Sequence, residues 1–281
     1  MKNIQRFSRF LFLLSVVFLH LAAFSQVSTN SAKNTMYTTL DLDLKDFFLG
    51  LDPQTAENVI DNIEVLFSNM LDENPTSAQL DVRDFYLKKF IHLFMNLAPK
   101  FDPVFVYLVD NYAAKLTQSE FLSDSEVYVF KRVADRKRRA FVGQTIPAFE
   151  SYTIDNQKIS TAGMTSDYTI LWFWDPDCDH CLEDTPKLYD FYCKYHDIYN
   201  FEVIACSITE DYDRWIAFIT EHRFDWINTS NAIATPNYDA MDFFDFNETP
   251  AIYIIDKQHK VVARQPSLDE LIEVFESLQQ K

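Results

Sequence analysis

Two cysteines separated by two residues, Cys178 and Cys181, directly follow an apolar segment at 168–174 and precede a segment with the pattern of a helix. This order suits reversible dithiol chemistry, because the free amides and the dipole at a helix N-terminus stabilise a thiolate on the first cysteine. A zinc ribbon has the same spacing but needs a second pair of ligands. The other two cysteines, Cys193 and Cys206, form no such pair. The pattern therefore favours redox chemistry, and we expect no metal.

The residues around the cysteines predict an α/β domain. Aromatic and apolar residues at helical spacing continue to Tyr199, and 201–207 follow as a buried strand, which completes a βαβ unit. A further apolar strand begins after Pro250 and is followed, after a polar turn, by a strand at 261–264. We expect a closing helix from about Leu268 to Leu278.

This combination resembles the thioredoxin superfamily, and within it the secreted TlpA/ResA-like thiol-disulfide oxidoreductases, over about residues 143–281. The residues that carry the resemblance are Trp172, Phe173, Trp174, Cys178, Asp179, His180, Cys181, Pro186, Thr249 and Pro250. The resemblance implies a thioredoxin-like fold, with a central mixed sheet flanked by helices. It also implies thiol-disulfide exchange with protein substrates, and no cofactor beyond the redox-active disulfide.

The same resemblance implies roles for individual residues. Cys178 looks like the exposed nucleophile, and Cys181 looks like the buried thiol that resolves a mixed disulfide. Pro250 looks like the cis-proline that faces the disulfide, and Thr249 looks like the residue that touches the substrate backbone. A cis X-Pro bond is rare in folded proteins, so this expectation is specific. The further expected substrate contacts are Trp174 and His180.

The resemblance also leads us to expect a carboxylate near the dithiol. Thioredoxin carries it on the preceding strand, where this chain has Trp172, whereas the ResA-like pattern has it six residues after the first cysteine, where this chain has Asp184. We interpret Asp184 as a catalytic group that accepts the Cys181 proton. The alternative is an exposed carboxylate favoured by the helix dipole.

The direction of electron flow does not follow from the loop. Two nearby carboxylates, Asp177 and Asp179, disfavour a thiolate on Cys178, whereas a protonated His180 favours it. The resemblance and Asp184 favour the reductase or isomerase direction. Two other classes stay open: a thiol peroxidase of peroxiredoxin type, and a non-catalytic binding protein on a thioredoxin scaffold. That peroxidase family has a threonine where this chain has Asp175.

The N-terminus predicts export. Basic residues precede an apolar stretch from Phe10 to Phe24, and Ala23-Phe24-Ser25 fits a signal-peptidase site, so we expect residues 1–25 to be a signal peptide. The predicted location is periplasmic or otherwise extracytoplasmic, with an uncleaved membrane anchor as the alternative. In an oxidising compartment, a reductant needs an electron donor, here a membrane protein. The formal net charge of −17 disfavours nucleic acid as a partner.

The rest of the chain predicts a second domain. We expect a flexible lead at 26–40, a helical domain at 41–142 and the thioredoxin-like domain at 143–281. The expected helices span about 52–71, 75–97, 102–116 and 123–140. Their apolar faces favour a small bundle, with a substrate-selecting groove as the alternative. Cys193 and Cys206 are interpreted as buried thiols, with a disulfide as the alternative. The sequence leaves the oligomeric state and the substrate open.

Overall fold

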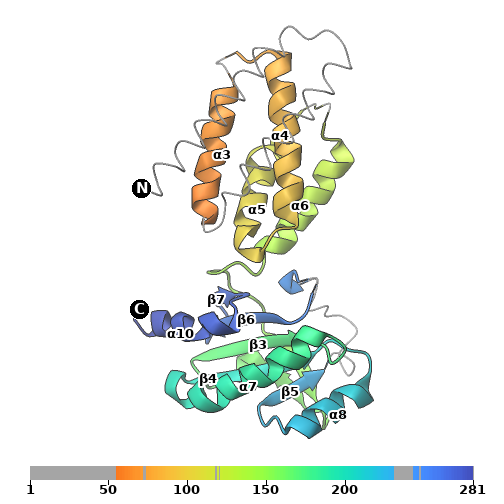
Figure 1. The fold of residues 1–281 in the computed structure, drawn as a ribbon, viewed down its shortest axis with the longest axis vertical. Coiled ribbons are helices and arrows are strands. Elements are labelled where there is room, and N and C mark those ends of the chain that lie inside the picture. The colour runs from red at the N-terminus through yellow and green to blue at the C-terminus, as the bar shows by residue number, and fades with distance from the viewer. Residues whose placement is uncertain are drawn as a thin grey trace. The chain divides into compact units, whose positions relative to one another are not determined.

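The computed structural model describes residues 55–71, 74–117, 119, 121–230, 243–246 and 248–280. The predicted signal peptide and flexible lead lie outside these residues. The chain divides into two compact units, Met1–Asp135 and Arg136–Lys281, which are described separately (Figure 1). The sequence-based domain boundary after residue 142 stays a prediction. Among the described residues, no helix is both long and apolar enough to span a bilayer.

The first unit is helical, as expected. Its elements are α3 (Ala56–Met70), α4 (Ser77–Met95), the 3-10 turn η1 (Pro99–Phe101), α5 (Asp102–Asn111), the 3-10 turn η2 (Ala113–Lys115) and α6 (Asp124–Arg138), whose last residues belong to the second unit. Their buried apolar residues form the core of a bundle, including Phe67, Phe90, Phe94 and Phe105. This burial agrees with the interpretation of the apolar faces as core.

Capping residues decide where these helices begin. Thr55 caps α3 by accepting a hydrogen bond from the Asn58 amide (3.3 Å), so the helix starts later than its predicted opening at 52. Thr76 and Gln79 form a capping box at the start of α4. Helix α5 ends earlier than its predicted last residue at 116. Tyr112 leaves the helical conformation at the C-terminal end of α5, and the 3-10 turn η2 follows.

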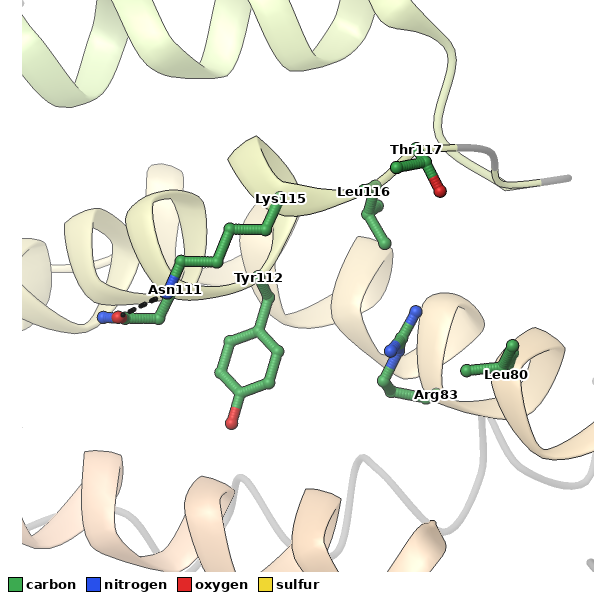
Figure 2. A pocket seen from close by; sticks show the side chains of 7 residues that line it. All are labelled: Leu80, Arg83, Asn111, Tyr112, Lys115, Leu116 and Thr117. Carbon is green, nitrogen blue, oxygen red and sulfur yellow. Dashed lines mark hydrogen bonds between the residues drawn. The ribbon is translucent and has the colours of Figure 1, made fainter. Parts of the chain in front are cut away.

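A pocket of about 270 Å³ opens in the helical unit (Figure 2). Its lining residues are Leu80, Arg83, Asn111, Tyr112, Lys115, Leu116 and Thr117. The Lys115 ammonium lies 3.3 Å from the Asn111 side-chain oxygen, and the Arg83 guanidinium donates to Asp84 (2.8 Å from Nε). Both cationic groups of this pocket are therefore already engaged by neighbouring side chains.

The second unit is built on a mixed sheet, as the resemblance implies. Its strands are β1 (Glu150–Thr153), β2 (Lys158–Ser160), β3 (Tyr168–Trp174), β4 (Phe201–Ser207), β5 (Ile227–Ser230), β6 (Ala251–Asp256) and β7 (Val261–Arg264), in the order β2-β1-β5-β4-β3-β6-β7. The central strand β3 runs parallel to β4 and antiparallel to β6. The predicted βαβ unit is therefore the centre of the sheet.

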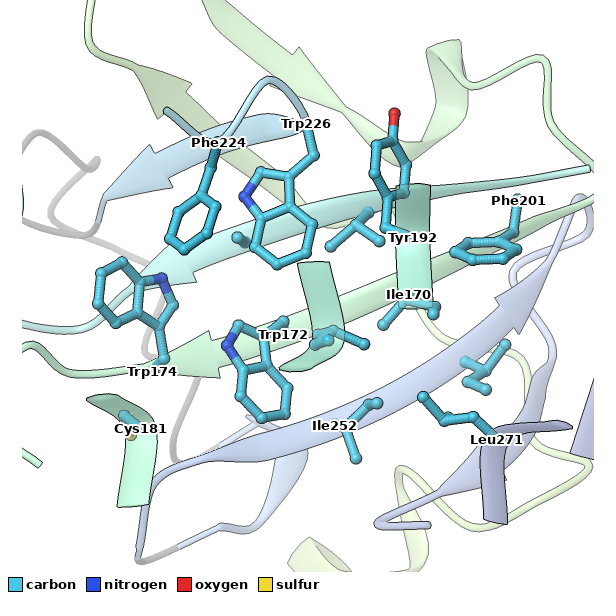
Figure 3. Close-up of a cluster of buried hydrophobic side chains, with 14 of the residues drawn as sticks. Ile170, Trp172, Trp174, Cys181, Tyr192, Phe201, Phe224, Trp226, Ile252 and Leu271 are labelled. Atoms are coloured by element: carbon cyan, nitrogen blue, oxygen red, sulfur yellow. The ribbon is translucent and has the colours of Figure 1, made fainter. Parts of the chain in front are cut away.

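Helices and 3-10 turns complete this unit: η3 (Thr161–Gly163), α7 (Asp179–Tyr199), α8 (Tyr212–His222), η5 (Leu268–Glu270) and α10 (Leu271–Gln279). Because side chains alternate along a strand, β3 contributes to two cores. Ile170, Trp172 and Trp174 lie in one core with residues of α7, α8 and α10 (Figure 3), whereas Leu171 and Phe173 lie in the other.

The two cores show whether Cys193 and Cys206 form a disulfide. Cys206 is buried in the core that contains Phe173, whereas α7 packs its residues Leu188 and Tyr192 into the opposite core. Cys193 lies on α7 and is exposed to solvent, so its interpretation as a buried thiol is wrong. No disulfide joins these two cysteines, because the sheet lies between the core of Cys206 and the helix of Cys193.

Candidate active site

Cys178 lies at the beginning of α7, in the position expected of a nucleophile. It is the N-cap of the helix, and its sulfur accepts a hydrogen bond from the Cys181 amide at 3.3 Å. The Cys178 thiol donates to the carbonyl oxygen of Thr249 at 3.1 Å. This sulfur therefore has a helix amide on one side and the segment before Pro250 on the other.

Cys181 is the buried member of the pair. None of its surface is exposed, and it belongs to the core that contains Trp172 and Trp174 (Figure 3). The Asp175 amide donates to its sulfur at 3.5 Å. Burial, followed by the hydrogen bond with Cys178, raises the pKa of the Cys181 thiol to about 12. At neutral pH this thiol is protonated, so it needs a proton acceptor before it can attack a mixed disulfide.

The peptide bond between Thr249 and Pro250 is cis, as the resemblance implies. Pro250 leads directly into β6, the neighbour of β3 in the sheet. Because the Cys178 thiol donates to Thr249, the cis-proline segment lies directly beside Cys178. A backbone carbonyl at this place is also suited to the pairing of an extended substrate segment.

Asp184 lies one turn beyond the dithiol on α7. The Lys187 ammonium donates to its carboxylate at 2.8 Å, and Asp184 lines a pocket of about 340 Å³ that also contains Trp172 and Pro250. Within the described part of the chain, no hydrogen bond joins Asp184 to either thiol. Its catalytic role stays a prediction, and proton transfer from Cys181 would need a bridging water.

Trp172 occupies the place where thioredoxin has a carboxylate. It is buried, and its indole nitrogen donates to the hydroxyl of Thr185 at 3.1 Å. Thr185 is completely buried on α7, three residues after Leu182. Thr185 was not among the residues predicted from the sequence, although its position four residues after Cys181 on a predicted helix was the available signal.

The two other residues predicted to contact substrate, His180 and Trp174, differ in their exposure to solvent. His180 is exposed on the first turn of α7, where a substrate could reach it. Trp174 is completely buried and packs against Phe218, with ring centroids 5.0 Å apart. This burial does not fit the predicted contact between Trp174 and substrate, because the strand alternation directs its ring into the core.

An ion pair beside Cys178 was not predicted from the sequence. Arg214, from α8, pairs with Asp177, the residue directly before Cys178. The pair places the positive charge of Arg214 beside Asp177, one of the two carboxylates that were expected to disfavour a thiolate on Cys178. The two residues are far apart in the sequence, so only the packing of α8 beside the loop brings them together.

A buried charge cluster supports the segment before the cis-proline. The Asp245 carboxylate is 2% exposed and lies 2.6 Å from Arg136 Nε, 3.3 Å from Lys137 Nζ and 3.4 Å from Arg264 Nη2. Its neighbour Phe244 packs in the core beside Phe173, with centroids 5.0 Å apart. These contacts anchor residues 243–246, which precede Thr249.

The second unit has a thioredoxin-like mixed sheet, and Cys178 and Cys181 lie at the start of its helix α7. Residues 166–261 match the family model described as thioredoxin-like, so this part of the chain is a thioredoxin-like domain. No curated protein matches the chain. Within the described residues, no group of three or more His, Cys, Asp or Glu side chains is arranged to hold a metal ion.

Solved structures are similar to the chain. A thioredoxin-like protein from Bacteroides caccae is 14% identical, with a TM-score of 0.61, and the match covers 92% of this chain and 87% of that one. A domain of a possible thiol-disulfide isomerase from Cytophaga hutchinsonii is 27% identical, with a TM-score of 0.45, over 50% of this chain and 97% of that one. The thioredoxin domain of a thiol-disulfide oxidoreductase from Bacteroides vulgatus is 20% identical, with a TM-score of 0.43, over 50% and 96%. The Bacteroides caccae match supports the fold along most of the chain.

Proposed function

We propose that this chain is a thiol-disulfide oxidoreductase that exchanges disulfides with protein substrates through Cys178 and Cys181. One observation carries the proposal. The Cys178 sulfur lies between the Cys181 amide and the Thr249 carbonyl, in front of a fully buried second thiol. This asymmetry supports a first cysteine that attacks and a second that resolves.

The reaction proceeds in two exchanges. The Cys178 thiolate attacks one sulfur of a substrate disulfide, a bond forms between the two sulfurs, and the other substrate sulfur leaves as a thiolate that takes up a proton. Cys181 then loses its proton and attacks the Cys178 sulfur, so that the enzyme disulfide forms and the second substrate sulfur leaves. Two electrons and two protons pass from the enzyme dithiol to the substrate, which is left with two thiols. The reverse reaction uses the same residues.

The supporting residues have defined parts in this scheme. Asp184 accepts the Cys181 proton through a bridging water, and the high pKa of the buried thiol is the reason that it needs such an acceptor. The backbone at Thr249 and Pro250 holds an extended substrate segment beside the sulfurs, and the exposed His180 contacts it. Asp184 and the resemblance to TlpA/ResA-like proteins favour the reductase or isomerase direction.

Export belongs to the same proposal. The basic and apolar pattern of residues 1–25 supports an exported protein. In an oxidising compartment, the dithiol stays reduced only if another dithiol protein returns electrons to it. We therefore include a membrane electron donor that reduces the enzyme disulfide by the same exchange.

Trapping tests the exchange. In Cys181→Ser, Cys178 can attack but the mixed disulfide cannot be resolved, so disulfide-linked partners should accumulate and disappear on reduction. The Cys178→Ser/Cys181→Ser protein should trap none, whereas Cys193→Ser/Cys181→Ser should trap as well as Cys181→Ser, since Cys193 is an exposed cysteine outside the pair. Partners that persist without Cys178 would contradict the proposal.

Redox titration tests the direction. Equilibration of the dithiol with glutathione at several ratios measures its reduction potential. A reductase or isomerase should lie well below the roughly −120 mV of the strongest periplasmic oxidants. A potential near that value would overturn the reductant direction and leave the exchange chemistry intact.

A further inference from the structure

The pocket beside the cis-proline has an apolar floor and a charged rim. It holds about 340 Å³, which suits one side chain of a bound peptide. The floor includes Trp172, Ile252 and Leu268, and the rim includes Asp184, Lys187 and Asp269. The pocket therefore offers contact to an aliphatic chain and polar groups at its opening.

Negative charge exceeds positive charge at this rim. Lys187 donates to Asp184 at 2.8 Å, and it is 61% exposed. The hydrogen bond with Asp184 raises the pKa of the Lys187 ammonium, and the charges of Asp184, Glu183 and Asp269 act in the same direction. Three carboxylates thus lie near a single ammonium group, so a second cation is favoured electrostatically.

The part of the pocket lining formed by residues 265–269 is held in place by hydrogen bonds. The Gln265 amide donates to the Ile252 carbonyl at 2.8 Å, which ties the segment after β7 to β6. Ser267 and Glu270 then form a capping box around η5, which contains Asp269. A wall fixed before binding loses little freedom when a ligand binds.

The position of the pocket connects it to the reaction. Pro250 lines the pocket, and the preceding residue, Thr249, accepts a hydrogen bond from Cys178. An extended chain advances about 3.3 Å per residue. A substrate segment whose sulfur reacts with Cys178 would therefore place a side chain one or two residues away at the mouth of the pocket.

We propose that this pocket selects substrates that carry a lysine or arginine one or two residues from the reacting cysteine. The aliphatic part of that side chain lies on Trp172 and Ile252, and its charged end lies beside Asp269 and Asp184. The inference rests on the proposed thiol-disulfide exchange and adds the chemical class of substrate that the site prefers.

Matched peptides test the preference. Three disulfide-linked peptides differ in one residue beside the cysteine, which is lysine, glutamine or glutamate, and kcat/KM is measured for each with the full chain. The reduced protein should favour lysine over glutamate by about fivefold at low salt, as for exposed charge pairs. The ratio should fall toward one at high salt, because ions screen exposed charges.

Variants at the rim assign the preference to the pocket. Asp269→Asn should reduce the ratio, and Asp269→Lys should bring it to one or below. Lys187→Gln should increase the ratio, because it removes the cation that competes with the substrate. Glu276→Lys, an equal charge change on an exposed part of α10 outside the pocket, should leave the ratio unchanged.

The glutamine peptide distinguishes a failure of the basic-residue preference from a failure of the proposed thiol-disulfide exchange. If the protein exchanges with this peptide but the ratio is one, or if Asp269→Lys changes the ratio no more than Glu276→Lys does, the pocket does not select basic residues. If no peptide is reduced although the dithiol is intact, the proposed exchange itself fails. Far-ultraviolet circular dichroism spectra equal to that of wild type would show that the Asp269 variants are folded.

Discussion

The two units of this chain use buried polar groups in different ways. In the helical unit, Tyr107 and Tyr112 both donate to Glu64, at the edge of an aromatic core. In the thioredoxin-like unit, the polar groups gather around two sulfurs, where the Cys181 amide and the Thr249 carbonyl contact Cys178. The first arrangement joins helices, whereas the second leaves a half-buried thiol that can react.

The pockets of the two units differ in the same way. In the helical unit, the cationic groups of the pocket are engaged by Asn111 and Asp84 (Figure 2). Beside the cis-proline, the carboxylates exceed the single ammonium of Lys187. A pocket with an unbalanced charge next to a nucleophile is the better candidate for substrate selection.

The largest expected effect belongs to the paired cysteines of the thioredoxin-like unit. Cys178→Ser should reduce disulfide exchange to the background rate, since it removes the sulfur that we propose to be the attacking group. The matched variant Cys193→Ser, on the same helix, should retain full activity. The measurement is the rate at which the reduced protein cleaves a fluorescent disulfide peptide. Exchange that survives in Cys178→Ser would place the reactive thiol elsewhere.

The second prediction concerns the anchor of the cis-proline segment. Asp245→Ala removes a buried carboxylate and leaves the charges of Arg136, Lys137 and Arg264 without it, so we expect a loss of about 3 kcal/mol in the free energy of unfolding. All four tryptophans of the chain lie in the second unit, at positions 172, 174, 215 and 226. Urea unfolding followed by tryptophan fluorescence therefore measures this unit.

A surface pair is the control for Asp245. Glu150 and Lys158 form an ion pair in which both side chains are about half exposed. Because such pairs contribute little, Glu150→Gln should leave the fluorescence transition where it is. If Asp245→Ala lowers the free energy of unfolding no more than this control does, the charge cluster around Asp245 does not anchor residues 243–246.

The third prediction addresses the proton of Cys181. Asp184→Asn should slow the resolution of the mixed disulfide about tenfold. This is less than the roughly 10²–10⁴-fold effect of a directly placed general base, because no hydrogen bond among the described residues joins Asp184 to the sulfur. Rapid-quench separation of the mixed disulfide measures this step. Glu183→Gln, the adjacent carboxylate, should resolve at the wild-type rate. Equal rates for both variants would return Asp184 to the role of an exposed helix carboxylate.

The sequence predicted the parts of the fold that rest on continuous local patterns. The run of apolar residues at 168–174 became β3 with the expected bounds, and the bond before Pro250 is cis. The strands β1, β2 and β5 were not predicted, because they span three or four residues and much of their surface is only partly buried. Short strands acquire their structure from their neighbours in the sheet.

The site was predictable where a single motif carries it. Cys178 and Cys181 follow from their spacing and context, whereas the partners Arg214 and Asp245 come from distant parts of the chain. The burial of Trp174 was not predicted for a related reason, because its place beside the motif did not tell which face of β3 it occupies. Contacts between distant elements depend on packing, and no local pattern encodes them.

The smallest expected effect belongs to the helical unit. Glu64→Gln weakens the hydrogen bonds from Tyr107 and Tyr112, and we expect a loss of about 1 kcal/mol in the free energy of unfolding of that unit. Far-ultraviolet circular dichroism should detect this loss. Tryptophan fluorescence should not, if the two units unfold separately. A shift of both signals together would show that the units unfold as one.

Glu64→Gln should also change the pH at which Tyr107 and Tyr112 ionise. Burial, followed by the hydrogen bond to Glu64, raises the pKa of Tyr107 to about 12, and the same causes raise the pKa of Tyr112. Unfolded tyrosines ionise near pH 10, so the stabilising contribution is complete below about pH 10 and is lost as the pH rises toward the folded pKa. Tyrosinate absorbance should therefore appear at lower pH in Glu64→Gln than in wild type. Unchanged titration curves would mean that Glu64 does not hold these hydroxyl groups in solution.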